Sequence, residues 1–377
     1  IATPNHWHAL MMVWACEAGK DVYVEKPCSH NLHEGRVAVE AAKRYDRIVQ
    51  HGTQGRSNPD WALAVELIRS GKLGKLLTSR ALCYKPRPSI GEQPTGSPPA
   101  DLDFNLWLGP APEQPYHGNL VHYNWHWFWD FGNGDIGNQG VHQMDIARWL
   151  IPGADGGSAT YPRSVLSLGG RFGYQDQGQT ANTQVSIMDF GDTKLIFEVR
   201  GLPTDEYHGQ KVGNFAHLEE GTIVGDQFVP KGKDEGIPLA KLCIDVTPKR
   251  GPGESHFDNF LAAVRSRKAD ELNAGILEGH HSAALCHLAN ISYRLGAEVP
   301  FSQSSQSFGD DKEAFETFSR MEEHLKANHV AIDGLKYRLG RKLAFNARTE
   351  TFENDPEADR LLTRTYRAPY VVPDHMS

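Results

Sequence analysis

The first 75 residues alternate short β-rich runs with helical patterns, and this rhythm constrains the possible fold more than any other feature. The predicted strands cover residues 21–25 and 47–50, and the predicted helices cover residues 6–18, 29–45 and 60–70. Residues 1–4 have the pattern of a buried strand end, and Asn5 and Asp60 are the expected helix caps. Alternation at this spacing predicts βαβ units, and therefore part of a doubly wound parallel sheet.

From residue 76 onward, apolar and polar residues alternate with a period of two. Residues 193–200 show this best, and Gly191 and Asp192 before them predict a hairpin turn. Further predicted strands cover residues 77–86, 164–173, 214–225 and 241–247, and predicted helices cover residues 256–267, 278–295 and 311–328. Several alternating strands with short turns predict an α+β region with a largely antiparallel open sheet.

These patterns divide the chain into three parts. Residues 1–75 are expected to form the C-terminal half of a dinucleotide-binding domain, and residues 76–300 an α/β substrate and oligomerisation domain. The helix at 278–296 is expected to pack back on the first part. Residues 301–377 are expected to form an extension that wraps over both domains.

Composition argues against several classes of function. The formal charge of −8 argues against nucleic acid or an anionic membrane as the main partner. Five scattered cysteines without a CxxC pair, and six histidines outside the candidate segments without HxH or HxxxH pairing with carboxylates, predict that there is no metal site. No apolar run approaches membrane-spanning length, so we expect a soluble protein, cytoplasmic by default. Export stays open, because a targeting segment would precede residue 1.

Residues 122–150 concentrate aromatic rings, a glycine-rich turn and a helical pattern. His142 and Asp145 are three residues apart, so they share a helix face and predict the floor of a pocket for a polar ligand. Tyr123, Trp125 and His126 are candidates to contact a sugar. A core helix whose His and Asp satisfy each other, with the Trp residues facing inward, is the alternative.

Three motifs resemble those of one family. Residues 2–8 (ATPNHWH) are similar to an A-T-P-x-x-x-H turn, and residues 25–27 match an E-K-P motif. Residues 137–145 (GNQGVHQMD) are similar to a G-x-D-x-G-x-H-x-x-D helix start. The chain therefore resembles the Gfo/Idh/MocA oxidoreductases, in a bacterial subgroup with an extended C-terminal region. The nucleotide fingerprint of that family would lie upstream, so we expect an N-terminally truncated Rossmann domain.

The resemblance implies hydride transfer between a nicotinamide cofactor, NAD or NADP, and a hydroxyl-bearing carbon of a sugar, cyclitol or glycoside. It also implies a homo-oligomer, a dimer or a tetramer. The residues that it places at the cofactor are Thr3, Pro4, Asn5, His8, Glu25, Lys26 and Pro27.

The chemistry of alcohol oxidation indicates the catalytic residues. His142 is the candidate base for the hydroxyl proton, because a histidine titrates near neutral pH. Lys26 follows a strand end, where its ammonium can stabilise a developing alkoxide, although a surface lysine paired with Glu25 is the alternative. Asn138 stands where the family usually has Asp, and it cannot take a proton. Asn138, Asp145, Tyr84, Trp125, His126 and Tyr123 are the candidate substrate ligands.

Two other functions use the same residues. A redox-assisted glycoside hydrolase or lyase would oxidise a sugar hydroxyl transiently and release free sugar without net NADH. A catalytically inactive sugar-binding relative is the second, and Asn138 is the residue that favours it.

Overall fold

A computed structural model describes residues 1–154, 156–302, 308 and 311–376. Its N-terminal part runs α1 (Asn5–Glu17), β1 (Val22–Val24), α2 (Leu32–Arg44) and β2 (Val49–His51). The two strands pair in parallel, as the sequence predicts, with Val22 opposite Val49. The main chain of Ile1 also bonds to Tyr23 and Glu25, so residue 1 extends this sheet beside β1.

Three of the predicted boundaries are wrong for local reasons. Asn5 is the buried first residue of α1 and does not cap it; Pro4 holds the cap position. Asn58, not Asp60, caps α3 (Pro59–Arg69), because its side chain accepts from the backbone N–H groups of Asp60 and Trp61. The strand expected at 241–247 does not form; the chain makes a short 3₁₀ turn, η3 (Leu239–Lys241), instead.

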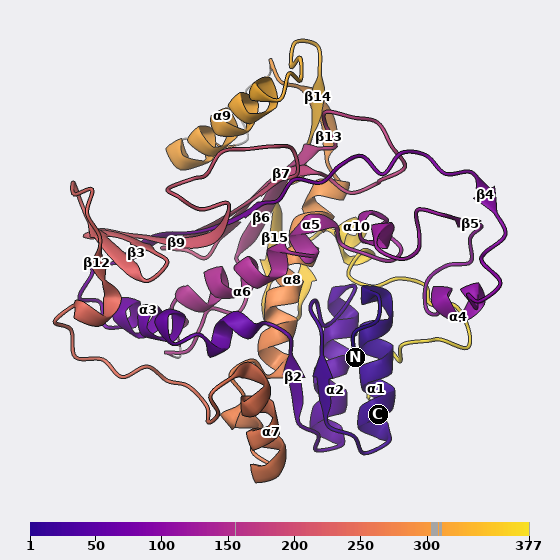
Figure 1. The fold of residues 1–377 in the computed structure, drawn as a ribbon, viewed down its shortest axis with the longest axis horizontal. Helices are drawn as coiled ribbons and strands as arrows, with labels where there is room; N and C mark the ends of the chain where they lie inside the picture. Colours follow the sequence, from indigo (N-terminus) through magenta and orange to yellow (C-terminus); the bar gives the residue numbers. More distant parts are fainter. Residues whose placement is uncertain (155, 303–307, 309–310, 377) are drawn as a thin grey trace.

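A large mixed sheet dominates the rest of the molecule (Figure 1). Its central order is β9–β3–β8–β7–β6, in which β3 and β8 are parallel and the other pairs are antiparallel. The strands are β3 (Leu76–Tyr84), β6 (Ser164–Gly170), β7 (Thr183–Asp189), β8 (Lys194–Arg200), β9 (Val212–Leu218), β10 (Gly221–Val224), β11 (Gln227–Pro230), β12 (Ile237–Pro238), β13 (Ala297–Pro300), β14 (Lys336–Leu339), β15 (Leu343–Asn346) and β16 (Thr351–Phe352). The predicted fold class, a Rossmann-type parallel sheet followed by a largely antiparallel one, is confirmed.

Two expectations about strands need correction. The single strand expected at 214–225 is a hairpin of β9 and β10, since the chain reverses at Glu219 and Glu220. The C-terminal segment does more than wrap the surface, because β14 and β15 both pair with β6 in the large sheet.

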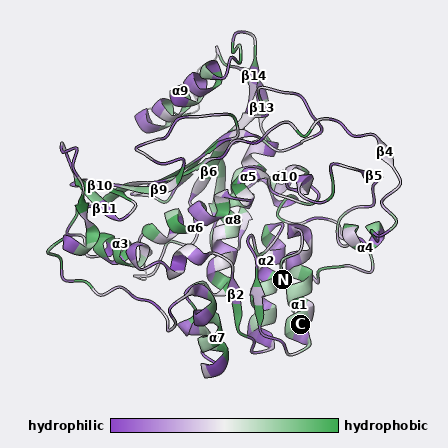
Figure 2. Cartoon of the chain, viewed as in Figure 1, coloured by the Kyte–Doolittle hydropathy of each residue, from purple (hydrophilic) through white to green (hydrophobic). Residues whose placement is uncertain are grey.

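Helices cover both faces of the large sheet. The helices α6 (Gly140–Leu150) and α8 (Ile276–Arg294) pack on one face, and α9 (Lys312–Ala327) lies against the other (Figure 1). Figure 2 shows green and purple residues interspersed on α9, as expected for a helix that buries one side. The long helix α8 also packs against α2, so it connects the two sheets.

The remaining elements are short or peripheral. They are α4 (Phe104–Leu108), α5 (Gly134–Gly137), α7 (His256–Ser266), α10 (Pro356–Asp359), β4 (Thr95–Gly96) and β5 (Tyr116–His117). After α10 the chain runs past α4 and ends beside α1 and α2 (Figure 1), where Tyr370 packs on Trp7 and Met376 bonds to Glu40. None of the helices in the described residues is both long and apolar enough to cross a bilayer.

Glu198 provides a test of how α9 is held on the sheet. Its carboxylate is 1% exposed and is bound by Arg80, at 2.5 Å, by Arg200 and, from α9, by Arg320. Glu198→Gln leaves three guanidinium groups without this counter-charge, so we expect a loss of about 3–5 kcal/mol in the free energy of unfolding. Urea unfolding followed by circular dichroism measures it.

Glu323→Gln is the matched control, because Glu323 is an exposed residue of the same helix. A Glu198→Gln protein as stable as this control would show that the cluster does not hold α9 on the sheet.

Candidate active site

Lys26 lies two residues beyond the end of β1 and reaches α5. Its Nζ donates to the main-chain oxygen of Asn138 at 3.2 Å and to the Asn138 side-chain oxygen at 3.1 Å. The side chain is half-buried, and burial lowers the pKa of its ammonium below 10.5, although Glu25 and Asp135 oppose this shift. Lys26 is therefore a partly desolvated cation that Asn138 holds in place at the carboxyl end of a parallel strand.

A chain of hydrogen bonds continues from Asn138. The Asn138 Nδ2 donates to the Tyr123 hydroxyl at 3.3 Å, and the Arg87 Nη1 donates to the same oxygen at 3.2 Å. Arg87 then binds both oxygens of Asp135, at 2.8 and 2.9 Å. Because this last pair is bidentate, it fixes the plane of the Arg87 guanidinium, and through it the position of Tyr123.

His142 is half-buried on α6, next to this network. Burial, and after it the ammonium groups of Lys26 and Lys85, together lower the pKa of its ring to about 4. The ring is therefore neutral at physiological pH, which leaves one nitrogen able to accept a proton. The structure thus brings Lys26, Asn138 and His142 together, as the motifs predict.

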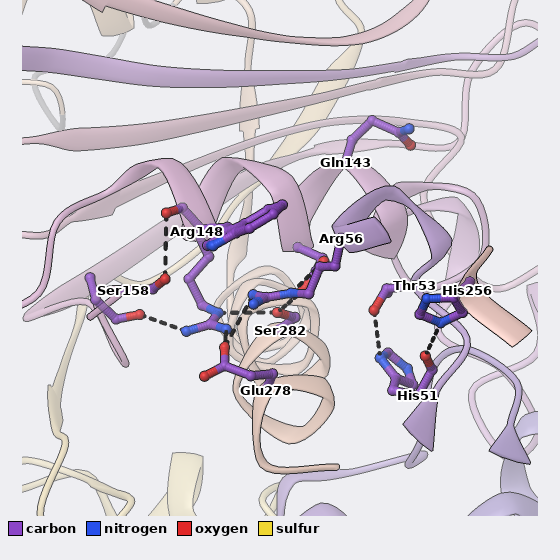
Figure 3. A network of polar contacts seen from close by, with 12 residues as sticks. His51, Thr53, Arg56, Gln143, Arg148, Ser158, His256, Glu278 and Ser282 are labelled. Atoms are coloured by element: carbon purple, nitrogen blue, oxygen red, sulfur yellow. Dashed lines mark hydrogen bonds and ion pairs between the residues drawn. The ribbon is translucent and has the colours of Figure 1, made fainter. Parts of the chain in front are cut away.

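Asp145 does not take part in this cluster. Although it shares α6 with His142, it is fully buried, and its oxygens accept from Arg56 at 2.8 and 2.9 Å and from Ser282 at 2.6 Å. Figure 3 shows Arg56, Arg148, Glu278 and Ser282 converging beside α6. Residues three apart on a helix are separated by only about 60° around its axis, so it is the contacts with Arg56 and with Ser282 of α8, and not the helix face, that take Asp145 away from His142. Asp145 is therefore available neither to orient His142 nor to bind a substrate in this structure.

The structure also separates Tyr84 from the cluster. Alternation along β3 points Ser79 towards α6 but points Tyr84 to the opposite face of the sheet, where its hydroxyl donates to Glu198 at 2.8 Å. The expectation that Tyr84 binds substrate alongside Lys26 is thus not supported by its position.

The aromatic candidates divide between core and surface. Trp125 is 7% exposed, stacks on His126 with ring centroids 3.6 Å apart, and packs with Leu120 and Phe131. His126 bonds to the main-chain oxygen of Tyr123, and burial lowers its pKa to about 3. Tyr123 is half exposed. Of these three residues, Tyr123 therefore has the most side chain free to meet a ligand.

The residues expected at the cofactor gather at the ends of the first strands. Both ring nitrogens of His8 lie 2.7 Å from main-chain oxygens, those of Thr3 and Pro27, so this ring joins the two turns. Pro4 caps α1, and the Glu25 carboxylate accepts from the backbone N–H of Lys26. The Asn5 Nδ2 is buried without a partner among the described residues, which leaves a donor at this end of α1.

The predicted site residues omitted Asp135, Arg87 and Lys85. Asp135 lies within the glycine-rich turn before Asn138, and an acidic residue in this turn was the signal that the sequence offered. The structure shows that its side chain is buried. Lys85 donates to Gln139 at 3.2 Å, next to the start of α6. Only the fold brings residues 85 and 87 to this turn, about 50 residues away in sequence. In the part of the chain that the structure describes, no cluster of three or more His, Cys, Asp or Glu could hold a metal ion.

Comparisons with known proteins agree with this architecture. Residues 1–53 match a family model described as "Oxidoreductase family, NAD-binding Rossmann fold", and residues 90–165 match one described as "Oxidoreductase family, C-terminal alpha/beta domain". Both belong to the Gfo/Idh/MocA group. Over these two segments the chain is similar to the Gfo/Idh/MocA oxidoreductase family.

Two curated relatives are similar over shorter segments. Levoglucosan dehydrogenase of Pseudarthrobacter phenanthrenivorans is 26% identical over 151 residues, which are 40% of this chain and 32% of that protein. The scyllo-inositol 2-dehydrogenase (NAD(+)) of Bacillus subtilis is 39% identical over 75 residues, which are 20% of this chain and 22% of that protein. The aligned regions thus span a third or less of these relatives.

Two solved structures share the fold. The WlbA dehydrogenase from Bordetella pertussis, in complex with NADH and UDP-GlcNAcA, has a TM-score of 0.52 and 18% identity, covering 78% of this chain and 75% of that chain. Levoglucosan dehydrogenase in complex with NADH and levoglucosan has a TM-score of 0.51 and 19% identity, covering 77% and 75%. At these identities, the likeness establishes a common fold only.

The shifted pKa of His142 can be tested directly. In a Lys26→Met protein, the pKa of His142 should rise from about 4 towards 6.5, because a cation that disfavours its protonated form is gone. NMR titration of histidine ring carbons measures it, with the signal assigned by its loss in His142→Gln. Lys72→Met, at an exposed lysine, should change nothing. An unaltered titration in Lys26→Met would refute the coupling.

Proposed function

We propose that this chain is part of an NAD(P)-dependent oxidoreductase that acts on a hydroxyl-bearing carbon of a sugar, cyclitol or glycoside. The observation that carries the proposal is the cluster of Lys26 and His142, with Lys26 held on Asn138 at the strand end. The family, and relatives named levoglucosan and inositol dehydrogenases, support the same class of substrate.

The two residues divide the chemistry between them. The neutral His142 ring accepts the hydroxyl proton as the carbon is oxidised. The Lys26 ammonium donates to the reacting oxygen and stabilises the negative charge that develops on it. A nicotinamide ring, when bound, supplies the hydride acceptor. With a pKa of about 4, His142 is a weak base, so the neighbouring ammonium must stabilise the alkoxide for proton transfer to be favourable.

The residues at the ends of β1 and α1 fit a dinucleotide cofactor. The Asn5 amide is a buried donor without a partner, and His8 holds the Thr3 and Pro27 turns together. Thr3, Pro4, Asn5, Glu25 and Pro27 would border the cofactor, and Lys26 would stand between it and the substrate. Open parallel sheets bind ligands at this end of their strands.

The substitution of Asn138 for the usual Asp does not leave Lys26 unsupported. The amide oxygen of Asn138 accepts from Lys26, and its nitrogen donates to Tyr123. An amide thus positions both groups, although it adds no negative charge beside the ammonium. This geometry favours an active enzyme over an inert sugar-binding relative.

The first experiment uses the full-length protein. NADH formation is followed with a panel of free sugars, cyclitols and glycosides. We expect turnover with at least one of them, and Lys26→Met or His142→Ala should lower kcat by about 10²-fold or more.

Lys72→Met and His375→Ala are the matched controls, since both residues are exposed. If cofactor binds but neither active-site substitution affects turnover, the assigned roles are wrong. If no nicotinamide binds and nothing turns over, the proposed function is wrong.

A redox-assisted glycoside hydrolase or lyase is the second candidate, and Tyr123 is the residue that favours it. Its exposed hydroxyl, bonded to Arg87 and Asn138, provides a second proton-transfer group beside Lys26. We expect such an enzyme to release aglycone from aryl glycosides at constant total NADH, and Tyr123→Phe to reduce that release. Net NADH formation in proportion to product would contradict it.

We also propose that the protein works as a homo-oligomer, a dimer or a tetramer, on a small-molecule sugar-like substrate. At one end of the large sheet the strand β12 pairs with β11 on one side, and its other side provides an edge for such contacts. Light scattering on the purified protein measures the assembly, and a monomer at micromolar concentration would contradict it.

A further inference from the structure

A polar cavity of about 240 Å³ lies apart from the Lys26–His142 cluster. It is enclosed by the start of α2, the loop before α5, the C-terminal half of α8 and residues 360–364. Neither Lys26 nor His142 lines it. At about 30 Å³ per water molecule, the space holds roughly eight waters or an organic molecule of similar size.

His30 lines this cavity and is more than nine-tenths buried, yet neither of its ring nitrogens has a partner among the described residues. Burial lowers its pKa well below 6.5, so the ring is neutral and offers one donor and one acceptor. The Asn133 side-chain oxygen, also in the wall, is likewise without a partner. Leaving buried polar atoms unpaired is unfavourable, so a ligand that pairs with them is bound more tightly.

Arg364, in the same wall, carries two further hydrogen-bond donors that lack a partner among the described residues. Its Nη1 donates to the main-chain oxygen of Asp130 at 2.8 Å, while Nε and Nη2 are buried and have no hydrogen bond within the part of the chain that the structure describes. Glu34 lies 3.7 Å from Nη2, but its carboxylate already accepts from His30 N and Asn31 Nδ2. The Nε and Nη2 groups form one edge of the guanidinium, and their two parallel N–H bonds match the two oxygens of a carboxylate.

The cavity wall carries an excess of positive charge. Arg294 and Arg360 line it beside Arg364, whereas Asp130 is the one carboxylate in the wall. Neither Arg294 nor Arg360 forms an ion pair with a carboxylate of the described residues; Arg294 lies over the Trp129 ring instead. With Glu34, which lies 3.7 Å from Arg364, two carboxylates stand against three guanidinium groups, and this remaining positive charge produces a local field that attracts an anion.

We propose that this cavity is a binding site for a small hydroxycarboxylate. Its carboxylate would take the free edge of Arg364, and its hydroxyl groups would pair with His30 and Asn133. A hydroxyl donates and accepts at once, which a neutral histidine and an amide oxygen require together. The bound ligand would connect residues 360–364 to α2 and α8, and would therefore stabilise the C-terminal segment against them.

Calorimetric titration of the full chain tests this with four probes: glycerate, propionate, glycerol and inorganic phosphate. We expect saturable binding of glycerate, at least tenfold weaker binding of propionate, which lacks hydroxyl groups, and none of glycerol. Phosphate binding as tightly as glycerate, or glycerol doing so, would overturn the assignment to a hydroxycarboxylate. No saturable binding by any probe would show that the cavity holds water only.

Arg364→Lys keeps the charge but removes the two-pronged edge, so the Kd for glycerate should rise at least tenfold. Arg367→Lys is the matched control, because Arg367 lies on the same segment but binds Asn105 and Gly109 outside the cavity. Should Arg364→Lys fail to fold, Arg294→Gln, at an exposed side chain, is the second variant and should also weaken binding. Unchanged affinity in the folded variant would refute the proposal. The result is independent of whether the Lys26–His142 cluster is catalytic.

Discussion

The buried ion pair between Arg56 and Asp145 is the contact on which the placement of the first sheet against α6 depends. Arg56 comes from the turn after β2, Asp145 from α6, and Ser282, which completes the set, from α8. All three are buried, so each charge has lost water and relies on the other. Because the three groups come from three parts of the chain, this contact fixes the first sheet relative to the helix that carries His142.

This contact also explains why the proposed site is divided as it is. Asp145, the carboxylate of the motif, binds Arg56 and so joins α6 to the turn after β2. His142, three residues earlier, lies near Lys26 instead. Positive charge is thereby concentrated around His142, where Lys26 and Lys85 both disfavour its protonated form. Glu25 and Asp135 are the acids that oppose this effect at Lys26, and the charge of Asp135 is taken by Arg87. The chemistry we propose follows from this unequal distribution of charge.

The C-terminal segment is a further constraint. It contributes β14 and β15 to the large sheet and then returns along α4 to α1 and α2 (Figure 1). In doing so it places Arg364 opposite His30, more than 300 residues earlier in the chain. This segment closes a cavity in which polar groups of His30, Asn133 and Arg364 lack partners among the described residues. These unpaired groups are the basis of the second site that we propose.

The amino-acid sequence by itself determined the local elements and the motif residues. The alternating pattern of the first 75 residues predicted the parallel pairing of β1 and β2, and the period-two runs predicted β3, β7 and β8. Lys26 and His142 were identifiable because the chemistry needs a cation and a base at those motif positions. These features depend on short-range sequence patterns, which can be recognised without knowledge of the fold.

Only the tertiary structure decided which side chains meet. Asp145 belongs to the Arg56 contact, Tyr84 lies on the far face of the sheet, and Arg87 with Asp135 fixes Tyr123. Each outcome depends on the face of a strand or on a contact between residues that are distant in the sequence. A sequence pattern specifies that a residue is buried or polar, but the partner of a buried polar group is chosen by the packing of the whole chain.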